Sequence, residues 1–226
     1  MGRPVYVVFV AGGSGTRMGT DVPKQFLDLG GMPVLMRTIY RFADAVPDMH
    51  AVTVLPRQHV GTWKELCVDH DFSIPQKIAV GGLTRFHSVL NALEKVPDGA
   101  IVAIHDGVRP FPSVEMLRSM FERMQAGAAD RSCRALVPST PVVDTLRSVD
   151  PDLPTPSRAS LVAVQTPQIF LSEELRAAYR QPYDTSFTDD ASVAERAGIP
   201  VTLCKGERTN IKITCPEDLL LAKGLL

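Results

Sequence analysis

Short runs of apolar residues alternate along this chain with stretches in which apolar residues recur at helical spacing. Apolar runs bounded by glycine, proline or polar residues are typical of buried strands. The helical spacing is typical of helices that place one apolar stripe on a sheet. The runs predict strands at residues 4–10, 51–55, 77–80, 100–105, 134–138, 161–165 and 200–204.

Helices are predicted between these strands, and three of them begin at capping residues. Thr84 and Ser113 each precede an apolar stripe, and the last helix opens with a capping-box spacing from Thr214 to Glu217, with proline in its first turn. The two stripes consist of Phe86, Val89, Leu90 and Leu93, and of Leu117, Met120, Phe121 and Met124. Strands that alternate with helices form parallel sheets through right-handed crossovers. The chain is therefore predicted to be an α/β protein, one domain over residues 1–226 with a single doubly wound, mostly parallel sheet.

Residues 138–160 interrupt this alternation. The stretch holds five prolines, alternating Val142, Val143 and Leu146, and no helical period. It is predicted to form a projecting β-arm. Because a lone hairpin is marginal in water, we expect the arm to pack on a second copy of the chain. A mobile surface loop is the alternative that this composition leaves open.

The balance of charged residues limits the kinds of partner that the chain is expected to bind. Lys and Arg number 24 against 25 Asp and Glu, a formal net charge of −1, whereas broad nucleic-acid or membrane surfaces need a basic excess. No apolar run approaches the length of a membrane span, and no export signal is visible. The four cysteines are far apart and are expected to be reduced thiols. We therefore expect a cytoplasmic protein with no nucleic-acid or membrane partner.

The first predicted strand runs into the glycine-rich sequence Ala-Gly-Gly-Ser-Gly-Thr-Arg-Met-Gly of residues 11–19. Backbone N–H groups in such a turn can surround an anion, and Arg17 and Lys24 follow within reach of the same anion. Walker A requires Lys and Ser/Thr after its last glycine, and the dinucleotide fingerprint requires its third glycine one residue before Gly19. The loop is therefore predicted to bind a phosphate chain, but in neither of those two ways.

Two polar clusters follow later strands. Asp106 and Arg109 come after an apolar run and face the glycine-rich loop, where a carboxylate could anchor magnesium and an arginine could bind a second anion. An Asx turn is the alternative for Asp106, and His105 is expected to be a packed residue rather than a base. Gly82 lies between a strand and a capped helix, and Ser88 follows in that helix; the Gly82 backbone and the Ser88 hydroxyl could contact a base or serve in capping alone.

Two further segments are polar. Residues 210–214 alternate polar and apolar, which predicts a strand with Asn210, Lys212 and Thr214 on one face and isoleucines behind it. Lys212 would then be an oriented cation, with a solvated lysine as the alternative. The pair Asp189-Asp190 is expected at a helix start, where acidic residues complement the helix dipole.

Taken together, these motifs resemble those of the 2-C-methyl-D-erythritol 4-phosphate cytidylyltransferase family, from Val5 to Leu226. The resemblance rests on the glycine-rich loop with Pro-Lys-Gln-Phe, Gly-Gly-x-x-Arg-x-x-Ser-Val, His-Asp-Gly-Val-Arg-Pro, Asp144-Thr145, Gln-Thr-Pro-Gln, Thr-Asp-Asp-Ala-Ser and Asn-Ile-Lys-Ile-Thr. It implies a Rossmann-like nucleotidyltransferase fold and a homodimer held through the arm. The implied activity is transfer of a cytidylyl group from CTP to a polyol phosphate, with release of pyrophosphate, in non-mevalonate isoprenoid synthesis.

The resemblance also implies roles for individual residues. The residues that would hold the nucleotide are Ala11, Gly12, Gly13, Ser14 and Gly15, with Gly82 and Ser88 on cytosine and Asp106 near the ribose and Mg²⁺ or another divalent cation. The residues that would act in catalysis are Arg17, Lys24, Arg158 and Lys212. The residues that would bind the acceptor are Arg109, Thr145, Arg158, Thr166 and Lys212.

Three alternatives to this activity stay open at the level of sequence. Ribitol 5-phosphate cytidylyltransferase shares most of the motifs, although Asp144-Thr145 and Arg158 resemble the methylerythritol branch more closely. A catalytically silent nucleotide-binding protein would be expected to lack the cations, and a pyrophosphorylase for UTP or GTP to have a longer chain. Three positions depart from the family pattern: Leu83 stands where many relatives carry an acid, Thr209 where some carry aspartate, and Gly107 where alanine is more usual.

Overall fold

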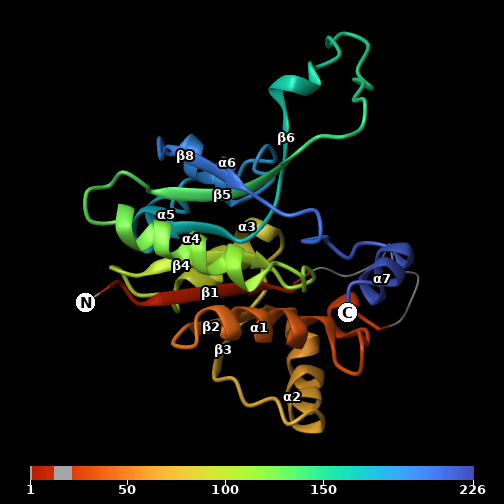
Figure 1. Ribbon diagram of the computed structural model, residues 1–226. Helices are drawn as coiled ribbons and strands as arrows, with labels where there is room; N and C mark the ends of the chain where they lie inside the picture. The colour runs from red at the N-terminus through yellow and green to blue at the C-terminus, as the bar shows by residue number, and fades with distance from the viewer. Residues whose placement is uncertain (1, 13–21) are drawn as a thin grey trace.

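The computed structural model describes residues 2–12 and 22–226 of the chain, and within them eight strands form one sheet (Figure 1). Its order is β3–β2–β1–β4–β7–β5–β6, and β8 pairs with β5. The strands are β1 (Val5–Val10), β2 (His50–Leu55), β3 (Gln76–Val80), β4 (Ile101–Asp106), β5 (Ala135–Pro141), β6 (Val162–Val164), β7 (Gln168–Leu171) and β8 (Val201–Lys205).

The parallel part of the sheet is built from the most apolar runs. β1 lies between β2 and β4 and is parallel to both, so that Val7 pairs with Ala51 on one side and with Ala103 on the other. β3 continues this part beyond β2, and β8 pairs in parallel with β5. The predicted α/β fold with a mostly parallel sheet is confirmed.

The antiparallel part contains a strand that the sequence did not predict. β7 lies between β4 and β5 and is antiparallel to both, with Phe170 opposite Val102 and Ala135. Its apolar run is short, Ile169-Phe170-Leu171, and follows the polar sequence Gln165-Thr166-Pro167-Gln168. Every residue of β7 is buried, so this strand closes the centre of the sheet.

Helices cover both faces of the sheet, as a doubly wound fold requires. They are α1 (Val34–Ala45), α2 (Val60–Asp69), α3 (Arg85–Leu93), α4 (Val114–Gly127), α5 (Ser172–Ala178), α6 (Asp190–Arg196) and α7 (Pro216–Lys223). One core cluster joins α1, α2 and α4 to one face, and a second joins α3, α5 and α6 to the other. Of the helices in the described ranges, none is both long and apolar enough to span a bilayer.

The predicted helix caps are confirmed for two helices and displaced in the third. The Thr84 side chain accepts a hydrogen bond from the His87 N–H, and the Ser113 side chain accepts one from the Met116 N–H. The last helix begins one residue later than predicted, with Cys215 at its N-cap, because Asp218 rather than Glu217 closes the capping box.

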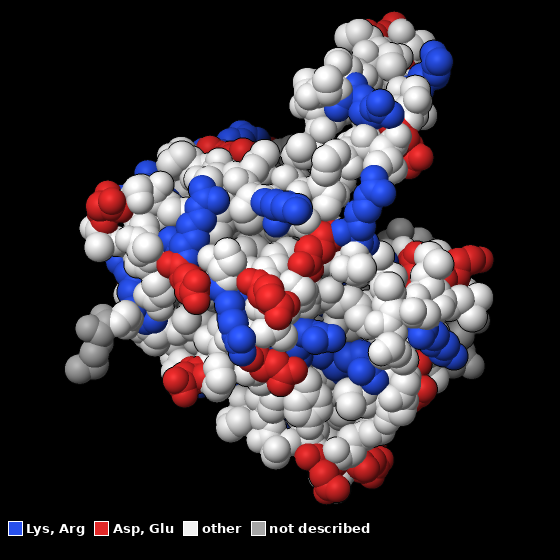
Figure 2. All heavy atoms as spheres, in the orientation of Figure 1, with Lys and Arg blue, Asp and Glu red and all other residues white. Residues whose placement is uncertain are grey.

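The arm leaves the sheet as the extension of two strands. Ser139 pairs with Val164 and Pro141 with Val162, so the two legs of the arm are antiparallel at its base. Between them the chain carries only a short 3₁₀ helix, η4 (Arg158–Ser160), and the arm projects beyond the rest of the molecule (Figures 1 and 2). The strand predicted at residues 161–165 is therefore a leg of the arm, and all three residues of β6 are exposed.

The prediction of a strand at residues 210–214 is wrong. This segment pairs with no strand in the described part of the chain and is tied to a loop by one backbone hydrogen bond, from the Ile213 N–H to the Val108 carbonyl at 3.0 Å. Ile213 is buried as expected, but Asn210 is fully buried as well and does not share an exposed face with Lys212. The alternation of polar and apolar residues here arises because an irregular segment between β8 and α7 packs its isoleucines into a core cluster, and not because the segment is a strand.

Candidate active site

Residues from separate loops line a hollow of about 480 Å³ where β1 and β4 end. The end of β1 supplies Ala11 and Gly12, the turn before α3 supplies Gly82, and α3 itself supplies Ser88; further residues are Lys24, Asp106 and Lys212. Carboxyl ends of parallel strands meet at one edge of a sheet, so an α/β fold gathers these distant residues there. We name this space the nucleotide hollow.

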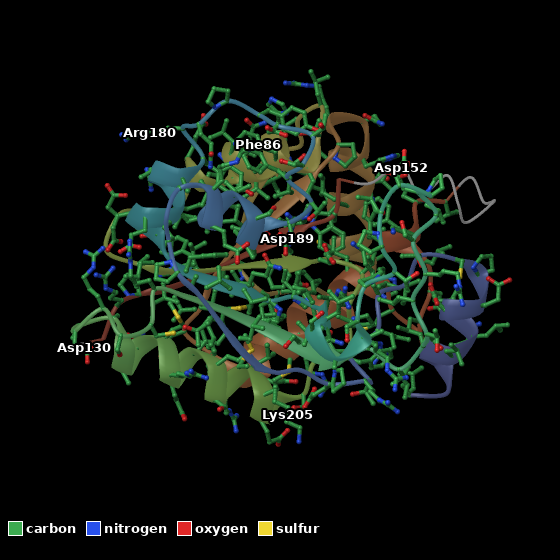
Figure 3. All side chains as sticks on the ribbon, turned by 90° about the horizontal axis from the view of Figure 1, so that it is seen from above. Phe86, Asp130, Asp152, Arg180, Asp189 and Lys205 are labelled. Carbon is green, nitrogen blue, oxygen red and sulfur yellow. The ribbon has the colours of Figure 1, made fainter. Side chains whose placement is uncertain are left out.

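A second hollow of about 260 Å³ adjoins the first on the side of the arm. Its lining includes Arg109, Thr166 and Asp189, the last of which lies near the middle of the molecule in Figure 3. We name this space the acceptor hollow. Both hollows are lined by Arg85, Asp106 and Lys212, so these three side chains form the wall between them.

Three cations surround the Asp106 carboxylate. Lys212 Nζ lies 3.0 Å and Arg109 Nε 3.1 Å from Oδ2, and Arg85 Nε lies 4.0 Å from Oδ1. Burial alone would raise the pKa of Asp106, but the cations hold that pKa well below its usual range. The carboxylate is therefore ionised at neutral pH and fixes three positive groups at one place.

Hydrogen bonds fix Asp106 and the residues behind it. The Asp106 N–H donates to Thr166 Oγ1 at 3.1 Å, and Thr166 Oγ1 also lies 3.1 Å from His105 Nδ1. His105 Nε2 lies 3.0 Å from the Arg109 carbonyl, so Nε2 carries the proton and Nδ1 accepts from Thr166. Burial lowers the pKa of His105 to about 4. His105 is thus an uncharged packing residue at neutral pH, as predicted.

Arg85 is a site residue that the sequence reasoning missed. Its Nη2 donates to Asp190 Oδ2 at 2.6 Å, and the Tyr179 hydroxyl donates to Asp190 Oδ1 at 2.6 Å. Burial opposes the charge of Arg85, but Asp190 and then Asp106 raise its pKa above the ordinary value. Asp190 is more than the dipole partner that the sequence predicted, since it also anchors the guanidinium. The sequence did contain an indication of this role, because Arg85 is the arginine of the Gly-Gly-x-x-Arg motif and directly follows the Thr84 cap as the first residue of α3.

The turn at Gly82 brings backbone close to a helix start. A Cβ at Gly82 would lie 2.4 Å from His87 Cβ, so only glycine fits there. Ser88 Oγ accepts from the Gly82 N–H at 3.0 Å and donates to the Thr84 carbonyl at 2.9 Å. Ser88 therefore shapes this turn, and both residues line the nucleotide hollow as the resemblance implied. Leu83 is 97% exposed on the same lining.

The remaining predicted residues fall into two groups. Gly13, Ser14, Gly15 and Arg17 lie outside the described residues. Thr145 and Arg158 lie in the arm, are exposed, and line neither hollow of this one chain. Arg158 Nη1 instead donates to the Val143 carbonyl at 2.9 Å within the arm. Thr209 lines a separate hollow beside Phe111 and is not in the described lining of either hollow that contains Asp106.

The residues suit a divalent cation that arrives with a nucleotide. Among residues 2–12 and 22–226, no cluster of three or more His, Cys, Asp or Glu side chains could hold a metal ion alone. The ion pair from Arg85 Nε to Asp106 Oδ1 is long, at 4.0 Å, so this oxygen could serve as one ligand of a divalent cation. Magnesium commonly takes one or two carboxylates and completes its shell with substrate phosphates and water.

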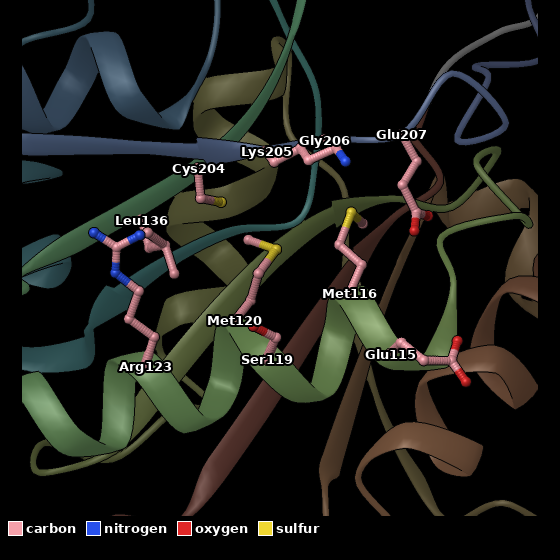
Figure 4. Close-up of a pocket in the computed structure, with 10 residues that line it drawn as sticks. All are labelled: Glu115, Met116, Ser119, Met120, Arg123, Leu136, Cys204, Lys205, Gly206 and Glu207. Atoms are coloured by element: carbon pink, nitrogen blue, oxygen red, sulfur yellow. The ribbon is translucent and has the colours of Figure 1, made fainter.

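A third hollow, of about 490 Å³, lies between α4 and β8 (Figure 4). Its lining includes Met116, Met120 and Arg123 of α4 and extends to Glu207. It shares no lining residue with the nucleotide or acceptor hollow, and none of the predicted site residues lies in it. Apart from the two arm residues, the predicted site residues that the structure describes therefore line the two hollows that share Asp106.

Comparison with known proteins agrees with this geometry. The family model described as 2-C-methyl-D-erythritol 4-phosphate cytidylyltransferase matches residues 5–226. The chain belongs to this family.

Relatives in the family are similar over nearly the whole chain. The enzymes so named from Bacteroides thetaiotaomicron and Porphyromonas gingivalis are 47% and 50% identical to it, over 97% and 98% of this chain and 98% and 97% of theirs. A crystal structure of 4-diphosphocytidyl-2C-methyl-D-erythritol synthase from Anaerococcus prevotii matches with a TM-score of 0.80 and 26% identity, covering 99% of this chain and 96% of that one. The family enzyme of Thermus thermophilus matches with a TM-score of 0.73 and 30% identity, over 100% and 98% of the two chains.

Proposed function

We infer that this protein transfers a cytidylyl group from CTP to 2-C-methyl-D-erythritol 4-phosphate, releasing pyrophosphate and forming the CDP-linked polyol of non-mevalonate isoprenoid synthesis. The observation that carries this function is the wall of Arg85, Asp106 and Lys212 between two hollows. A reaction that joins two phosphorylated substrates needs two adjoining anion sites, with cations where the new bond forms.

The larger hollow suits the nucleotide. Backbone at Gly12 and Gly82 can approach a ligand closely, and Lys24 lines the same space. The glycine-rich residues 13–15 and Arg17 follow Gly12 directly in sequence, so we propose them as contacts of the triphosphate. Gly82 and Ser88 would contact the cytosine edge.

The smaller hollow suits the acceptor phosphate. Arg109 and Lys212 present cations there, and Thr166 lines the same space. An oxygen of the acceptor phosphate would attack the α-phosphorus in line with the leaving pyrophosphate. A phosphate monoester has its second pKa near ~6 and is already nucleophilic at neutral pH. The reaction therefore needs no side-chain base, which agrees with the packed, uncharged His105.

The cations would stabilise charge that builds on the α-phosphate and the pyrophosphate as the bond exchanges. Lys212 belongs to the shared wall, and Lys24 and Arg17 would act from the nucleotide side. Asp106 would hold a magnesium ion that neutralises phosphate charge when it is bound. Because Asp106 also fixes Lys212 and Arg109, it orients cations whether or not it is a metal ligand.

We propose that the arm completes the acceptor hollow in a homodimer. The arm carries exposed apolar side chains that no described residue of the same chain covers, with Val143 56% and Leu153 60% exposed. Pairing with a second copy would bury them and could bring Thr145 and Arg158 to the acceptor phosphate. The reaction uses phosphorylated intermediates, which is in keeping with a cytoplasmic location.

A turnover assay tests the function. Pyrophosphate release should be fast with CTP and slow with UTP, because groups that pair with the cytosine edge are left unpaired by uracil. The assay is run with methylerythritol phosphate and with ribitol 5-phosphate as acceptors. Preference for the methylerythritol compound supports the proposal, and preference for ribitol 5-phosphate overturns the acceptor assignment. Equal use of UTP and CTP would overturn the roles of Gly82 and Ser88.

A further inference from the structure

Residues 206–212 are hydrogen-bonded to both legs at the base of the arm, and we call this segment with its hydrogen bonds the strap. On the first leg, the Gly206 N–H donates to the Ser139 carbonyl at 2.8 Å. On the second, Gln165 Nε2 donates to the Glu207 carbonyl at 2.7 Å, and Gln165 Oε1 accepts from the Glu207 N–H at 3.1 Å. The segment is therefore held by one backbone hydrogen bond on the first leg and by a pair of side-chain hydrogen bonds on the second, although it forms no strand there.

The strap depends on close approach at Gly206. A Cβ at this position would lie 2.6 Å from Gln165 Oε1 and 3.1 Å from both the N and O atoms of Ser139. A side chain would thus push the segment away from one leg or the other.

Asn210 connects this strap to the acceptor cations. It is fully buried, and its Nδ2 donates to the Thr166 carbonyl at 2.9 Å and reaches Gln165 Oε1 at 3.4 Å. Its own carbonyl accepts from Arg109 Nη1 at 2.8 Å. Lys212 follows two residues later, with its Nζ on Asp106. One buried amide thus fixes the segment that holds Arg109 and Lys212, two of the three cations in the described lining of the acceptor hollow.

We propose that Asn210 is a positioning residue: it fixes Arg109 and Lys212 relative to the base of the arm, so that the acceptor phosphate is oriented only while the strap is intact. Asn210 lines neither hollow, so it acts through other residues. The Asn210 amide donates to two oxygens without bringing a charge into the interior, and its buried Oδ1 has no hydrogen-bond partner among the described residues. The inference rests on the proposed function of the acceptor hollow.

Substitution of Asn210 tests the proposal by a split between kinetic constants. In Asn210→Ala the KM for methylerythritol phosphate should rise about tenfold and kcat should fall by a similar factor, while the KM for CTP changes less than about twofold. CTP is affected less because Gly12, Gly82 and Ser88 lie outside residues 206–212, and Lys212 is the one residue of that segment in the described lining of the nucleotide hollow. A variant that raises both KM values together, or neither, overturns the proposal.

The matched control is Ser113→Ala. Ser113 Oγ donates to Glu207 Oε1 at 2.5 Å, and the Ser113 N–H donates to Glu207 Oε2 at 2.8 Å, so this residue holds the same segment from α4. Its loss removes a helix cap and should lower the melting temperature while both KM values stay unchanged. If Ser113→Ala produced the same kinetic split as Asn210→Ala, general loosening would explain both, and the proposal would be wrong.

A second variant decides the matter should Asn210→Ala fail to fold. Gln165→Glu keeps the acceptor for the Glu207 N–H but places a carboxylate against the Glu207 carbonyl. Protonation restores a donor, so the activity of the variant relative to the wild type should rise as the pH is lowered from about 8 to about 6. A flat ratio overturns the proposal. A wild-type protein that transfers cytidylyl groups to neither acceptor would instead refute the proposed function itself.

Discussion

Lys212 Nζ lies 3.0 Å from Asp106 Oδ2, and this ion pair stands in the wall between the two hollows. Lys212 is the most exposed of the three cations on Asp106, with 40% of its side chain accessible against 28% for Arg85 and 12% for Arg109. Asp106 thus orients a cation that can still contact a ligand on either side, without a rearrangement of the site.

Loss of Lys212 should therefore act mainly on turnover. Lys212→Ala is expected to lower kcat by roughly two to three orders of magnitude, the range for removal of one preorganised charge partner in a transition state. Steady-state kinetics on pyrophosphate release measures the effect. Lys64→Ala, which removes an exposed lysine of α2, is the control. A kcat within about twofold of that control would show that Lys212 is only a surface cation.

Lys24 should behave similarly from the nucleotide side. It lines the nucleotide hollow and is next to the buried Gln25, whose Nε2 donates to the Ala11 carbonyl at 3.0 Å. Lys24→Ala should lower kcat by roughly two to three orders of magnitude while CTP binding weakens less, because the charge it meets grows in the transition state. Calorimetric titration with CTP, beside turnover, separates the two effects. A loss confined to CTP affinity would contradict this role.

The backbone at Gly82 offers a steric test. In Gly82→Ala the new Cβ would lie 2.4 Å from His87 Cβ and 3.0 Å from His87 C, so the turn before α3 must move. We expect the KM for CTP to rise at least about tenfold, since the displaced backbone lines the nucleotide hollow. Gly61→Ala is the matched control because a Cβ there meets no atom within 4 Å. Unchanged CTP kinetics in Gly82→Ala would remove this turn from the nucleotide site.

The burial of His105 predicts a dependence of stability on pH. Its pKa is lowered by burial to about 4, whereas an unfolded histidine titrates near ~6.5. Between these values the unfolded chain binds more protons, so this contribution is fully present above about pH 6.5 and is lost as the pH falls towards about 4, at most about 3 kcal/mol. Urea unfolding at several pH values in metal-free buffer measures it. His105→Gln should be less stable at pH 7 but should lose less on acidification, and equal slopes in both proteins would refute the assignment.

The central fold could be predicted because its strands are continuous apolar runs buried on both faces. The run that ends at Val10 and the run that ends at Asp106 each indicated both a strand and the functional loop behind it. β7 could not be predicted from periodicity, since three apolar residues after Pro167 are too few to distinguish a strand from a loop. β7 is buried because it lies between β4 and β5, and the pattern of residues 168–171 alone gives no information about these distant neighbours.

The site was predictable where a residue acts by its place at a strand end, as Asp106 does. Arg85 and Asp190 were missed as a pair because they are 105 positions apart and meet only when α3 and α6 pack on the same face of the sheet. Asn210 was assigned to an exposed strand face because alternation alone cannot distinguish a strand from an irregular segment tied by side-chain hydrogen bonds.

The arm is expected to need a second copy of the chain for two reasons, the exposed apolar side chains it carries and the acceptor contacts proposed for it. In one chain it exposes Val143, Leu153 and also Val149, which is 102% exposed, and it carries Thr145 and Arg158 away from the acceptor hollow. A cation on an arm without support binds a phosphate but does not orient it. We therefore expect a homodimer in which the arm of one copy completes the site of the other.

Arg158→Ala should then raise the KM for the acceptor and lower kcat while leaving CTP binding nearly intact, since the nucleotide hollow contains no residue of the arm among its described lining. Arg147→Ala, which removes another exposed arginine of the arm, is the control and should change neither constant. Sedimentation velocity at assay concentration, run beside kinetics on a variant shortened within residues 142–160, provides the second measurement. The shortened protein should be monomeric and should turn over far more slowly than the wild type. A fully active monomer, or an Arg158→Ala enzyme that loses CTP affinity instead, would show that the arm does not complete the acceptor hollow.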